Sequence, residues 1–124
     1  MIVETRRQTK VVTVVDNIAL TVPAEETSYV VTGADIDIAD FATGMLLITA
    51  GSETATATLD VVFQVKDSNG NYYTHTSATQ VTQAGSSVKA IAQLDGETGR
   101  VVVTLGDAAA DAFAGVTVEL VLKS

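Results

Sequence analysis

The sequence predicts an all-β protein, an antiparallel β-sandwich that is jelly-roll-like and carries an N-terminal arm. Apolar and polar residues alternate with a period of two along several segments, which is typical of strands with one buried face. Turn-forming pairs of Asp, Asn, Gly, Ala and Ser separate these segments roughly every 8–12 residues, as in sandwiches and barrels. The 124 residues include no cysteine, so an apolar core has to hold the fold without disulfides.

The strongest alternation runs over residues 59–66, 100–105 and 116–123, where every second residue is Val, Leu or Phe. A shorter example places Ile36 and Ile38 between aspartates. These patterns predict strands with one face toward the core. Further strands are predicted at 10–15, 18–22, 27–32, 44–50, 72–76, 79–82 and 87–93.

One segment is compatible with a helix, "DAAADAFA" at residues 107–114. Its first residue, Asp107, is suited to capping a single helical turn between the last two strands. Because eight residues hardly form a stable helix alone, we predict a loop with helical tendency.

Eight or nine strands are predicted after residue 27, which fits a jelly roll better than a seven-stranded immunoglobulin sandwich. The Cys…Trp…Cys core of antibody-type domains is also missing. We therefore predict a sandwich domain over 27–124 and an arm with short strands over 1–26, joined at Pro23. An arm of this kind is suited to adding a strand to a neighbouring chain.

Charge is unevenly distributed along the chain. Fifteen acidic and seven basic residues give a net charge of −8, which disfavours binding to nucleic acids and to anionic membranes. Arg6, Arg7 and Lys10 outweigh Glu4, so the first ten residues are basic while the rest is acidic. We predict that these three basic residues dock on an acidic protein surface; the alternative is a frayed terminus.

The sequence shows neither a membrane span nor a secretion signal. No apolar run approaches the ~18–20 residues of a transmembrane helix. Charges at positions 4, 6 and 7 interrupt any apolar stretch after Met1. Signal-dependent export is therefore not expected.

The stretch "DSNGNYYTH" at 67–75 gathers the residues most capable of ligand chemistry. Asp67, Asn69 and Asn71 match positions 1, 3 and 5 of a calcium loop. Tyr72 and Ala78 occupy the positions where that loop needs Gly and Glu, so no metal site is predicted. Asn69-Gly70 instead predicts a tight turn between two strands.

Catalysis finds little support in the sequence. His75 is the only histidine and lacks partner motifs, so we predict a half-exposed strand histidine. Asp35 and Asp37 share one strand face, as glycosidase carboxylates can, but a solvent-facing strand explains them equally well. Tyr72 and Tyr73 could stack on a sugar ring, although carbohydrate modules usually also expose tryptophan, which this chain lacks. No catalytic or cofactor-binding residue is predicted.

The region from about residue 44 to 122 resembles small capsid decoration (head cement) proteins of tailed bacteriophages. The matching stretches are "LLITAGSETATATLDVVFQVKDSNGNYYT", "TQVTQAGSS", "GRVVVTLGD" and "GVTVELVLKS". The chain departs from that pattern in lacking a Pro-Asp-Gly-type turn and the tryptophan after it. It also has "DAAADAFAG" where a Gly-Thr-Ser-type loop is usual.

The resemblance implies a structural virion protein without enzyme activity or cofactor. It implies a homotrimer that is made in the host cytoplasm and binds the major capsid protein and neighbouring copies on the capsid surface. The alternatives are a phage tail or fibre component and a β-sandwich carbohydrate-binding module. The residues predicted to contact other proteins are Arg6, Arg7, Lys10, Asn69, Tyr72 and Tyr73.

Overall fold

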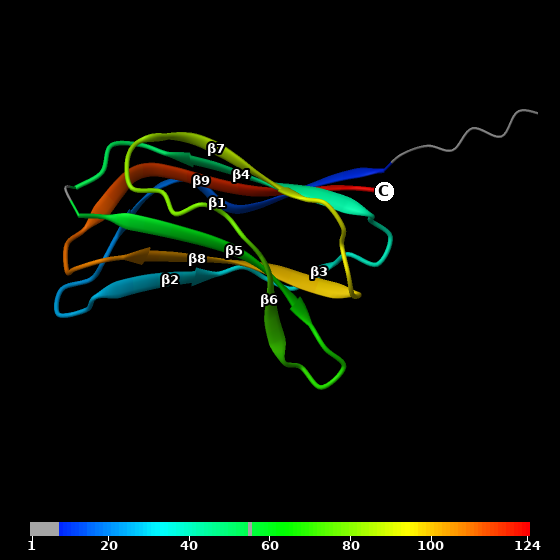
Figure 1. The fold of residues 1–124 in the computed structure, drawn as a ribbon. Helices are drawn as coiled ribbons and strands as arrows, with labels where there is room; N and C mark the ends of the chain where they lie inside the picture. The colour runs from blue at the N-terminus through cyan, green and yellow to red at the C-terminus, as the bar shows by residue number, and fades with distance from the viewer. Residues whose placement is uncertain (1–7, 55) are drawn as a thin grey trace, which may run out of the picture.

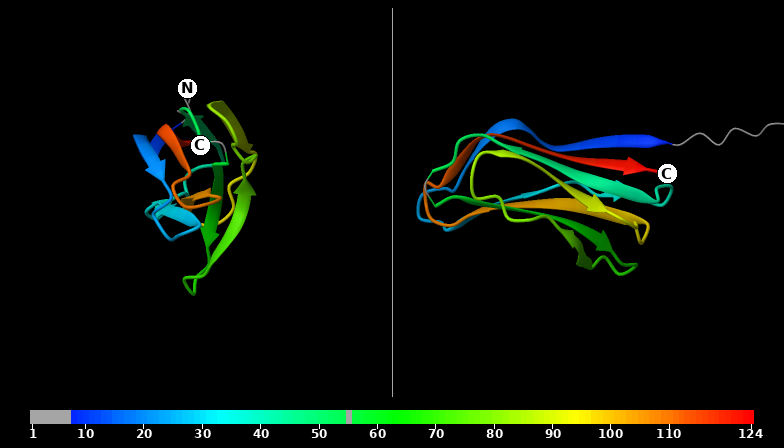
Figure 2. Two further views of the ribbon diagram at one scale, coloured as in Figure 1. Left: turned by 90° about the vertical axis from the view of Figure 1, so that its left-hand side faces the viewer. Right: turned by 45° about the horizontal axis from the view of Figure 1, so that its top comes forward.

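Two antiparallel β-sheets pack face to face in the computed structural model, which describes residues 8–54 and 56–124 (Figures 1 and 2). Helices are absent from these residues, so none in this part of the chain is long and apolar enough to cross a membrane. The strands are β1 (Thr9–Thr21), β2 (Ser28–Thr32), β3 (Ile36–Asp37), β4 (Thr43–Ala50), β5 (Thr58–Lys66), β6 (Tyr72–Ser77), β7 (Gly85–Ile91), β8 (Thr98–Gly106) and β9 (Ala112–Lys123).

The order of the strands defines a jelly roll. Sheet A has the order β1-β9-β4-β7, and sheet B has the order β2-β8-β5-β6, with β3 paired to β8. When the two-residue β3 is set aside, the first strand pairs with the last, the second with the second-last, and so on inward. This nested pairing folds one long double ribbon into two sheets, as in jelly rolls. The predicted fold class is confirmed.

The core lies between the sheets and consists mainly of aliphatic side chains. Strand β8 shows why: its residues alternate between buried and partly exposed along its whole length, so one face points inward. Phe63 and Phe113 are fully buried, and Val, Leu and Ile fill the remaining space. Each fully buried side chain of this size contributes about 1.5–3 kcal/mol relative to an exposed one.

Strand β1 corrects the predicted arm over residues 1–26. It pairs with β9 of its own chain, and its Val15 and Leu20 lie in the core. The Asp16-Asn17 pair, which suggested a turn between two short strands, forms an irregularity within one strand. Asn17 has a φ of 47°, and its N–H donates to Thr117 Oγ1 at 3.1 Å while the register shifts. The sandwich therefore begins at Thr9, not at residue 27.

Two local predictions are wrong. Residues 79–82 form no strand, because Val81 alone pairs there, in an isolated bridge to Leu59 within the crossing from sheet B to sheet A. Residues 107–114 form no helical turn: β9 already begins at Ala112, and Asp111 is buried. In both segments the secondary structure depends on backbone pairing with strands that are distant in sequence, and the local sequence does not reveal that pairing.

Candidate functional site

The hairpin between β5 and β6 is organised by one carboxylate. Asp67 Oδ1 accepts hydrogen bonds from the backbone N–H groups of Asn69 at 2.9 Å and Asn71 at 2.8 Å. Its Oδ2 accepts from Asn71 Nδ2 at 3.2 Å and from the Tyr73 hydroxyl at 3.1 Å. Gly70 has a φ of 88°, the left-handed conformation that a tight turn needs. The predicted turn at Asn69-Gly70 is thus present.

The same contacts determine the protonation state of Asp67 and the direction of its carboxylate oxygens. The hydrogen bonds, first that from the Asn71 backbone, hold the pKa of Asp67 below its usual range. Both carboxylate oxygens are directed at donors within the hairpin, so they stabilise the turn. Within 8–54 and 56–124, no three Asp, Glu or His side chains cluster closely enough to hold a metal ion.

A second polar cluster lies beside the hairpin on the outer face of sheet B. The guanidinium carbon of Arg100 stands 3.4 Å from the ring centre of Tyr72, a cation–π stack. The Tyr72 hydroxyl donates to Asp35 Oδ1 at 2.5 Å, and Lys66 Nζ lies 3.0 Å from Asp35 Oδ2. Arg100 Nε donates to Gln64 Oε1 at 2.9 Å. These contacts fix the Tyr72 ring between a cation and a carboxylate.

The protonation of this cluster follows from its contacts. The hydrogen bond from Tyr72 and then that from Lys66 lower the pKa of Asp35, so its carboxylate stays charged. The same carboxylate raises the pKa of Lys66. Both side chains are partly exposed, so the ion pair orients them more than it stabilises the fold.

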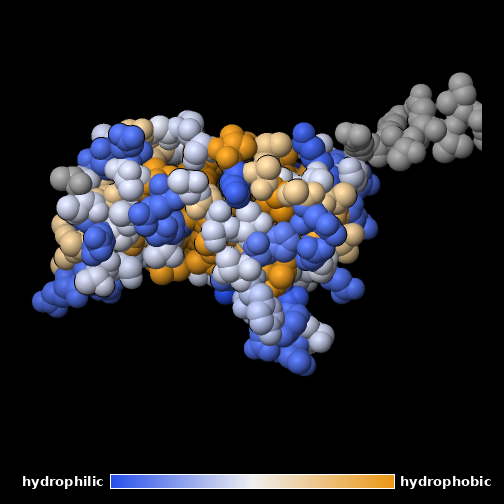
Figure 3. Space-filling model, viewed as in Figure 1, coloured by the Kyte–Doolittle hydropathy of each residue, from blue (hydrophilic) through white to orange (hydrophobic). Residues whose placement is uncertain are grey.

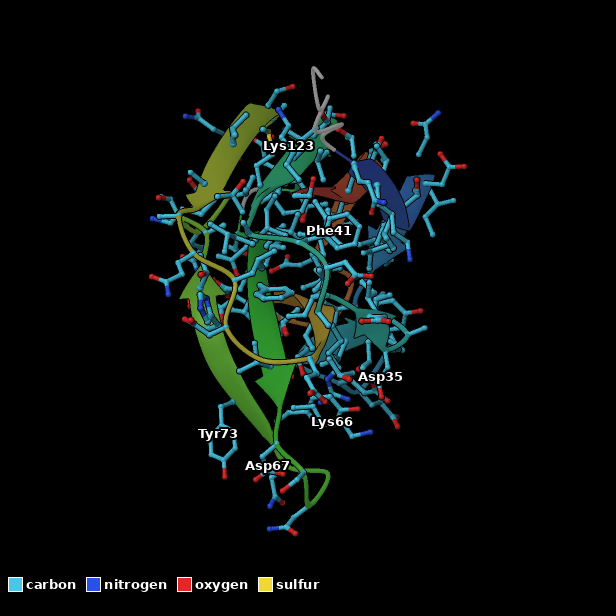
Figure 4. All side chains as sticks on the ribbon, turned by 90° about the vertical axis from the view of Figure 1, so that its right-hand side faces the viewer. Asp35, Phe41, Lys66, Asp67, Tyr73 and Lys123 are labelled. Carbon is cyan, nitrogen blue, oxygen red and sulfur yellow. The ribbon has the colours of Figure 1, made fainter. Side chains whose placement is uncertain are left out.

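Tyr73 differs from Tyr72 in exposure. It is 56% exposed and stands at the side of the hairpin with its hydroxyl on Asp67 (Figure 4). That hydrogen bond to a carboxylate raises the pKa of Tyr73. The ring therefore offers an exposed apolar surface whose orientation is already fixed.

Lys10 lies at the same end of the sandwich. Together with Asp35 and Asp37 it lines a hollow of about 430 Å³ between β1 and the β2–β3 connection. A neighbouring hollow of about 490 Å³ also includes Asp35 and Asp37, together with Lys66 and Glu97. We call this region, with Lys10, Asp35, Lys66, residues 67–71, Tyr72, Tyr73 and Arg100, the hairpin end (Figure 4).

The structure brings together most of the residues predicted to contact other proteins. Asn69, Tyr72 and Tyr73 are neighbours on the hairpin, and Lys10 is on β1 at the same end. Arg6 and Arg7 lie outside the described residues.

Sequence reasoning considered Asp35 only as a possible glycosidase carboxylate, and it missed Lys66 and Arg100 altogether. Their role depends on β3, β5 and β8 being neighbours in one sheet. The alternation does place Lys66 and Arg100 on solvent-facing positions, but only the pairing of the strands puts both beside Tyr72.

His75 has a partner that the sequence did not reveal. Its Nε2 lies 3.1 Å from Asp95 Oδ2 and its Nδ1 lies 2.8 Å from Thr76 Oγ1, while the Phe63 ring meets the imidazole edge-on at 5.8 Å. His75 lies on strand β6, as predicted, but its side chain is only 20% exposed, less than the half-exposed histidine that the sequence predicted. The pair of His75 with Asp95 fastens β6 to the β7–β8 loop.

The opposite end of the sandwich is held by Asp111, the only buried charged residue within 8–54 and 56–124. Thr56 Oγ1 donates to its two oxygens at 2.8 and 2.6 Å, and the backbone N–H groups of Asp107 and Ala108 donate at 3.1 Å each. The Thr56 hydroxyl above all, and the backbone donors after it, lower the pKa of Asp111. One carboxylate thus joins the β4–β5 loop to the β8–β9 loop.

Comparison with known proteins finds similarity of structure but not of sequence. No protein-family model matches the sequence, and no curated protein sequence is significantly similar to it. The structure of infectious bursal disease virus Gx strain matches with a TM-score of 0.61 at 9% identity over 96% of this chain. The VP2 subviral particle of that virus matches with a TM-score of 0.60 at 10% identity over 95% of this chain. Its T13 viral particle matches at 0.59, with 8% identity over 94%.

These likenesses show a common fold. Almost all of this chain is superimposed, so the whole jelly roll is shared. The chain spans about a third of the length of the virus proteins, since 32%, 33% and 31% of those chains are covered.

Proposed function

We propose that this chain is a structural protein of a virus particle, and specifically a decoration (cement) protein on the outer capsid surface of a tailed bacteriophage. The observation that carries the proposal is the complete jelly-roll pairing, which the chain shares over almost its whole length with proteins of virus particles. The bacteriophage origin and the decoration role rest on the sequence resemblance.

The hairpin end is the proposed contact with the major capsid protein. Tyr and Arg are enriched where proteins meet, and this end presents Tyr73 on one side of the hairpin and the Arg100–Tyr72 stack on the other. The hydrogen bonds to Asp67 already fix the hairpin, so docking loses little conformational entropy. Lys10 and Asn69 extend this surface, and the basic Arg6 and Arg7 add charge that suits an acidic partner.

Attachment in this proposal is multivalent. The sequence resemblance implies a homotrimer, and three linked chains that each make a weak contact bind a shell far more tightly than one. The proposed location is the outer surface of the virion, after synthesis in the host cytoplasm. The role requires no catalysis, no cofactor and no binding to nucleic acid or membrane.

A binding assay with empty shells tests the proposal. Tailless shells are prepared without this protein from the virus that carries its gene, and the purified chain is added before sedimentation. We expect saturable co-sedimentation, with Tyr73→Ala weakening it about tenfold or more, as for an exposed aromatic at the centre of an interface. Tyr29→Ala is the matched control, because Tyr29 is 39% exposed on β2 at the other end of the sandwich.

Two results would count against the proposal. Failure of the wild-type chain to bind shells would overturn the decoration role. Equal weakening by Tyr73→Ala and Tyr29→Ala would remove the hairpin end as the contact surface while leaving the decoration role in place.

A further inference from the structure

The outer face of sheet A is unusually apolar for a surface open to water. Residues directly opposite each other in antiparallel strands share a face, so the register places side chains from all four strands in rows. One row crosses the sheet through positions 11, 121, 45 and 90, and the next adds positions 47 and 88. We call these six residues the apolar face: Val11, Met45, Leu47, Val88, Ala90 and Val121.

The exposure of these residues shows that this chain does not cover the face. Val11 is 55% and Val88 65% exposed, and Met45, Leu47 and Val121 are partly exposed. Figure 3 shows hydrophobic side chains reaching the surface at the top of the molecule, over the sheet that contains β4 and β7. A sheet with one solvated face normally places polar residues there.

The outer face of sheet B provides the contrast within the same molecule. Its rows carry Asp60, Gln64, Lys66, Arg100 and Thr104, with the valines Val30, Val62 and Val102 interspersed among them. The charged residues on the described rows of the sheet A face are Glu119 and Lys123, both on β9. The chain contains 15 acidic and 7 basic residues, 22 charged residues in all, so charged side chains are not scarce. Their low number on the outer face of sheet A therefore indicates that a partner covers this face.

The edges of sheet A do not serve as the contact. Lys10 on β1 lies opposite the core residue Leu122, and Lys89 on β7 lies opposite the core residue Leu46. Both edge strands thus carry a lysine on the inward side, a feature that prevents another strand from adding to the edge. Association through this sheet is directed to its face.

We propose that the apolar face binds the same face of a second copy of this chain about a two-fold axis. Glu119, Val121 and Lys123 stand on one side of β9, with the two charges about 14 Å apart and Val121 midway between them. The proposed two-fold axis passes through Val121, lies in the plane of the interface and runs perpendicular to the strands, so the β9 strands of the two copies run in opposite directions. Each Glu119 then lies opposite Lys123 of the other copy. The row at positions 11, 121, 45 and 90 lies opposite the same row of the other copy.

The dimensions of the face agree with such a contact. Four strands at about 4.8 Å spacing make the face about 19 Å wide, and 7–13 residues at about 3.4 Å each make it about 24–44 Å long, so its area is roughly 450–850 Å². A standard interface buries about 800 Å² per partner. Face-to-face packing of two sheets is also how the domain itself is built.

This contact is independent of the proposed role on a capsid and leaves the hairpin end free. If the chain also forms trimers, the two-fold contact joins chains of neighbouring trimers. The apolar face is therefore tested on the purified chain alone, without shells.

The test is a charge reversal read by sedimentation velocity and light scattering from about 1 to about 100 µM, the range in which contacts of moderate affinity dissociate. Glu119→Lys or Lys123→Glu alone places like charges opposite each other twice per pair of chains. Each single variant is expected to raise the dissociation constant more than about tenfold and to halve the assembly mass at intermediate concentration. The double variant Glu119→Lys/Lys123→Glu restores the opposite charges and is expected to restore association.

Val88→Ser and Val30→Ser provide matched controls for the apolar part. Both valines are at least half exposed, Val88 on the outer side of sheet A and Val30 on that of sheet B. Only Val88→Ser is expected to weaken association, and neither variant is expected to change the melting temperature at a concentration where the wild-type chain is monomeric. A wild-type chain whose mass does not rise with concentration would overturn the proposal. Single charge reversals without effect, or a double variant no better than the singles, would overturn the two-fold arrangement.

Discussion

Replacing Gly99 by alanine probes the packing that supports the hairpin end. Gly99 lies on β8 next to Arg100, and a Cβ added to it would stand 2.6 and 2.8 Å from two ring carbons of Phe63. It would also stand 3.0 Å from the backbone oxygen of Gln64. Because the Phe63 ring is fully buried, it cannot swing into solvent to make room.

The expected cost follows from these contacts. Overpacking of a close-packed core costs about 1–3 kcal/mol. Against this, alanine in a strand gains about 0.5–1 kcal/mol over glycine because the unfolded chain loses less entropy on folding. We therefore expect Gly99→Ala to destabilise the protein by about 1–2 kcal/mol, which corresponds to a fall of roughly 0.5–1 M in the urea midpoint.

A second substitution makes this prediction specific. Phe63→Leu removes the ring atoms that the new methyl group would strike, and alone it costs about 1–2 kcal/mol, below the ~3–5 kcal/mol of Phe→Ala. If the clash is the cause, the double variant is more stable than the sum of the single effects predicts, by at least about 1 kcal/mol.

Urea unfolding of the four proteins in the cycle measures the coupling. Gly44→Ala provides the control: its Cβ would meet the Val121 backbone oxygen at 2.9 Å, in the other sheet, so Phe63→Leu should not rescue it. A coupling within about 0.5 kcal/mol of zero for the Gly99–Phe63 pair would refute the packing argument.

Three further predictions concern charges and the N-terminal segment. The lowered pKa of Asp111 means that its stabilising effect is present above the unfolded pKa of about 3.9 and is lost as pH falls through the folded pKa. Asp111→Asn should lower the melting temperature at pH 7 and flatten its acid dependence; equal profiles for both proteins would contradict this. Asp67→Asn should move the pKa of Tyr73 down toward its ordinary value of about 10, which ultraviolet difference titration detects, and an unmoved titration would exclude the hydrogen bond as the cause. Deleting residues 1–7 should leave the melting temperature unchanged, since β1 starts at Thr9, yet weaken shell binding; tight binding by the truncated chain would remove Arg6 and Arg7 from the contact.

Period-two alternation was enough to predict the sandwich, because burial on one face leaves a direct trace in the sequence. It located β5 to within one residue and β8 to within two, whereas β9 begins at Ala112, four residues before the predicted start. It failed for β1, where the bulge around Asn17 interrupts the alternation and imitates a turn. It also failed at 79–82, where polar residues with β propensity lie outside any sheet.

The candidate site was partly predictable for a similar reason. Asn69, Tyr72 and Tyr73 are close in sequence and stay together on the hairpin, so local reasoning found them. Asp35 precedes β3 and Arg100 lies on β8, and both reach Tyr72 of β6 only through the topology of sheet B. The apolar face was hidden for the same reason, since no single strand contributes more than two of its six residues.

A reconstruction of purified virus particles, combined with counting of this chain per particle, tests the central claim most directly. The account predicts a fixed copy number in proportion to the major capsid protein. It also predicts density for the sandwich on the outer surface of the shell, with the hairpin end against the capsid. Density on the tail would contradict the decoration role, and absence of the chain from purified particles would contradict a structural role in the virion altogether.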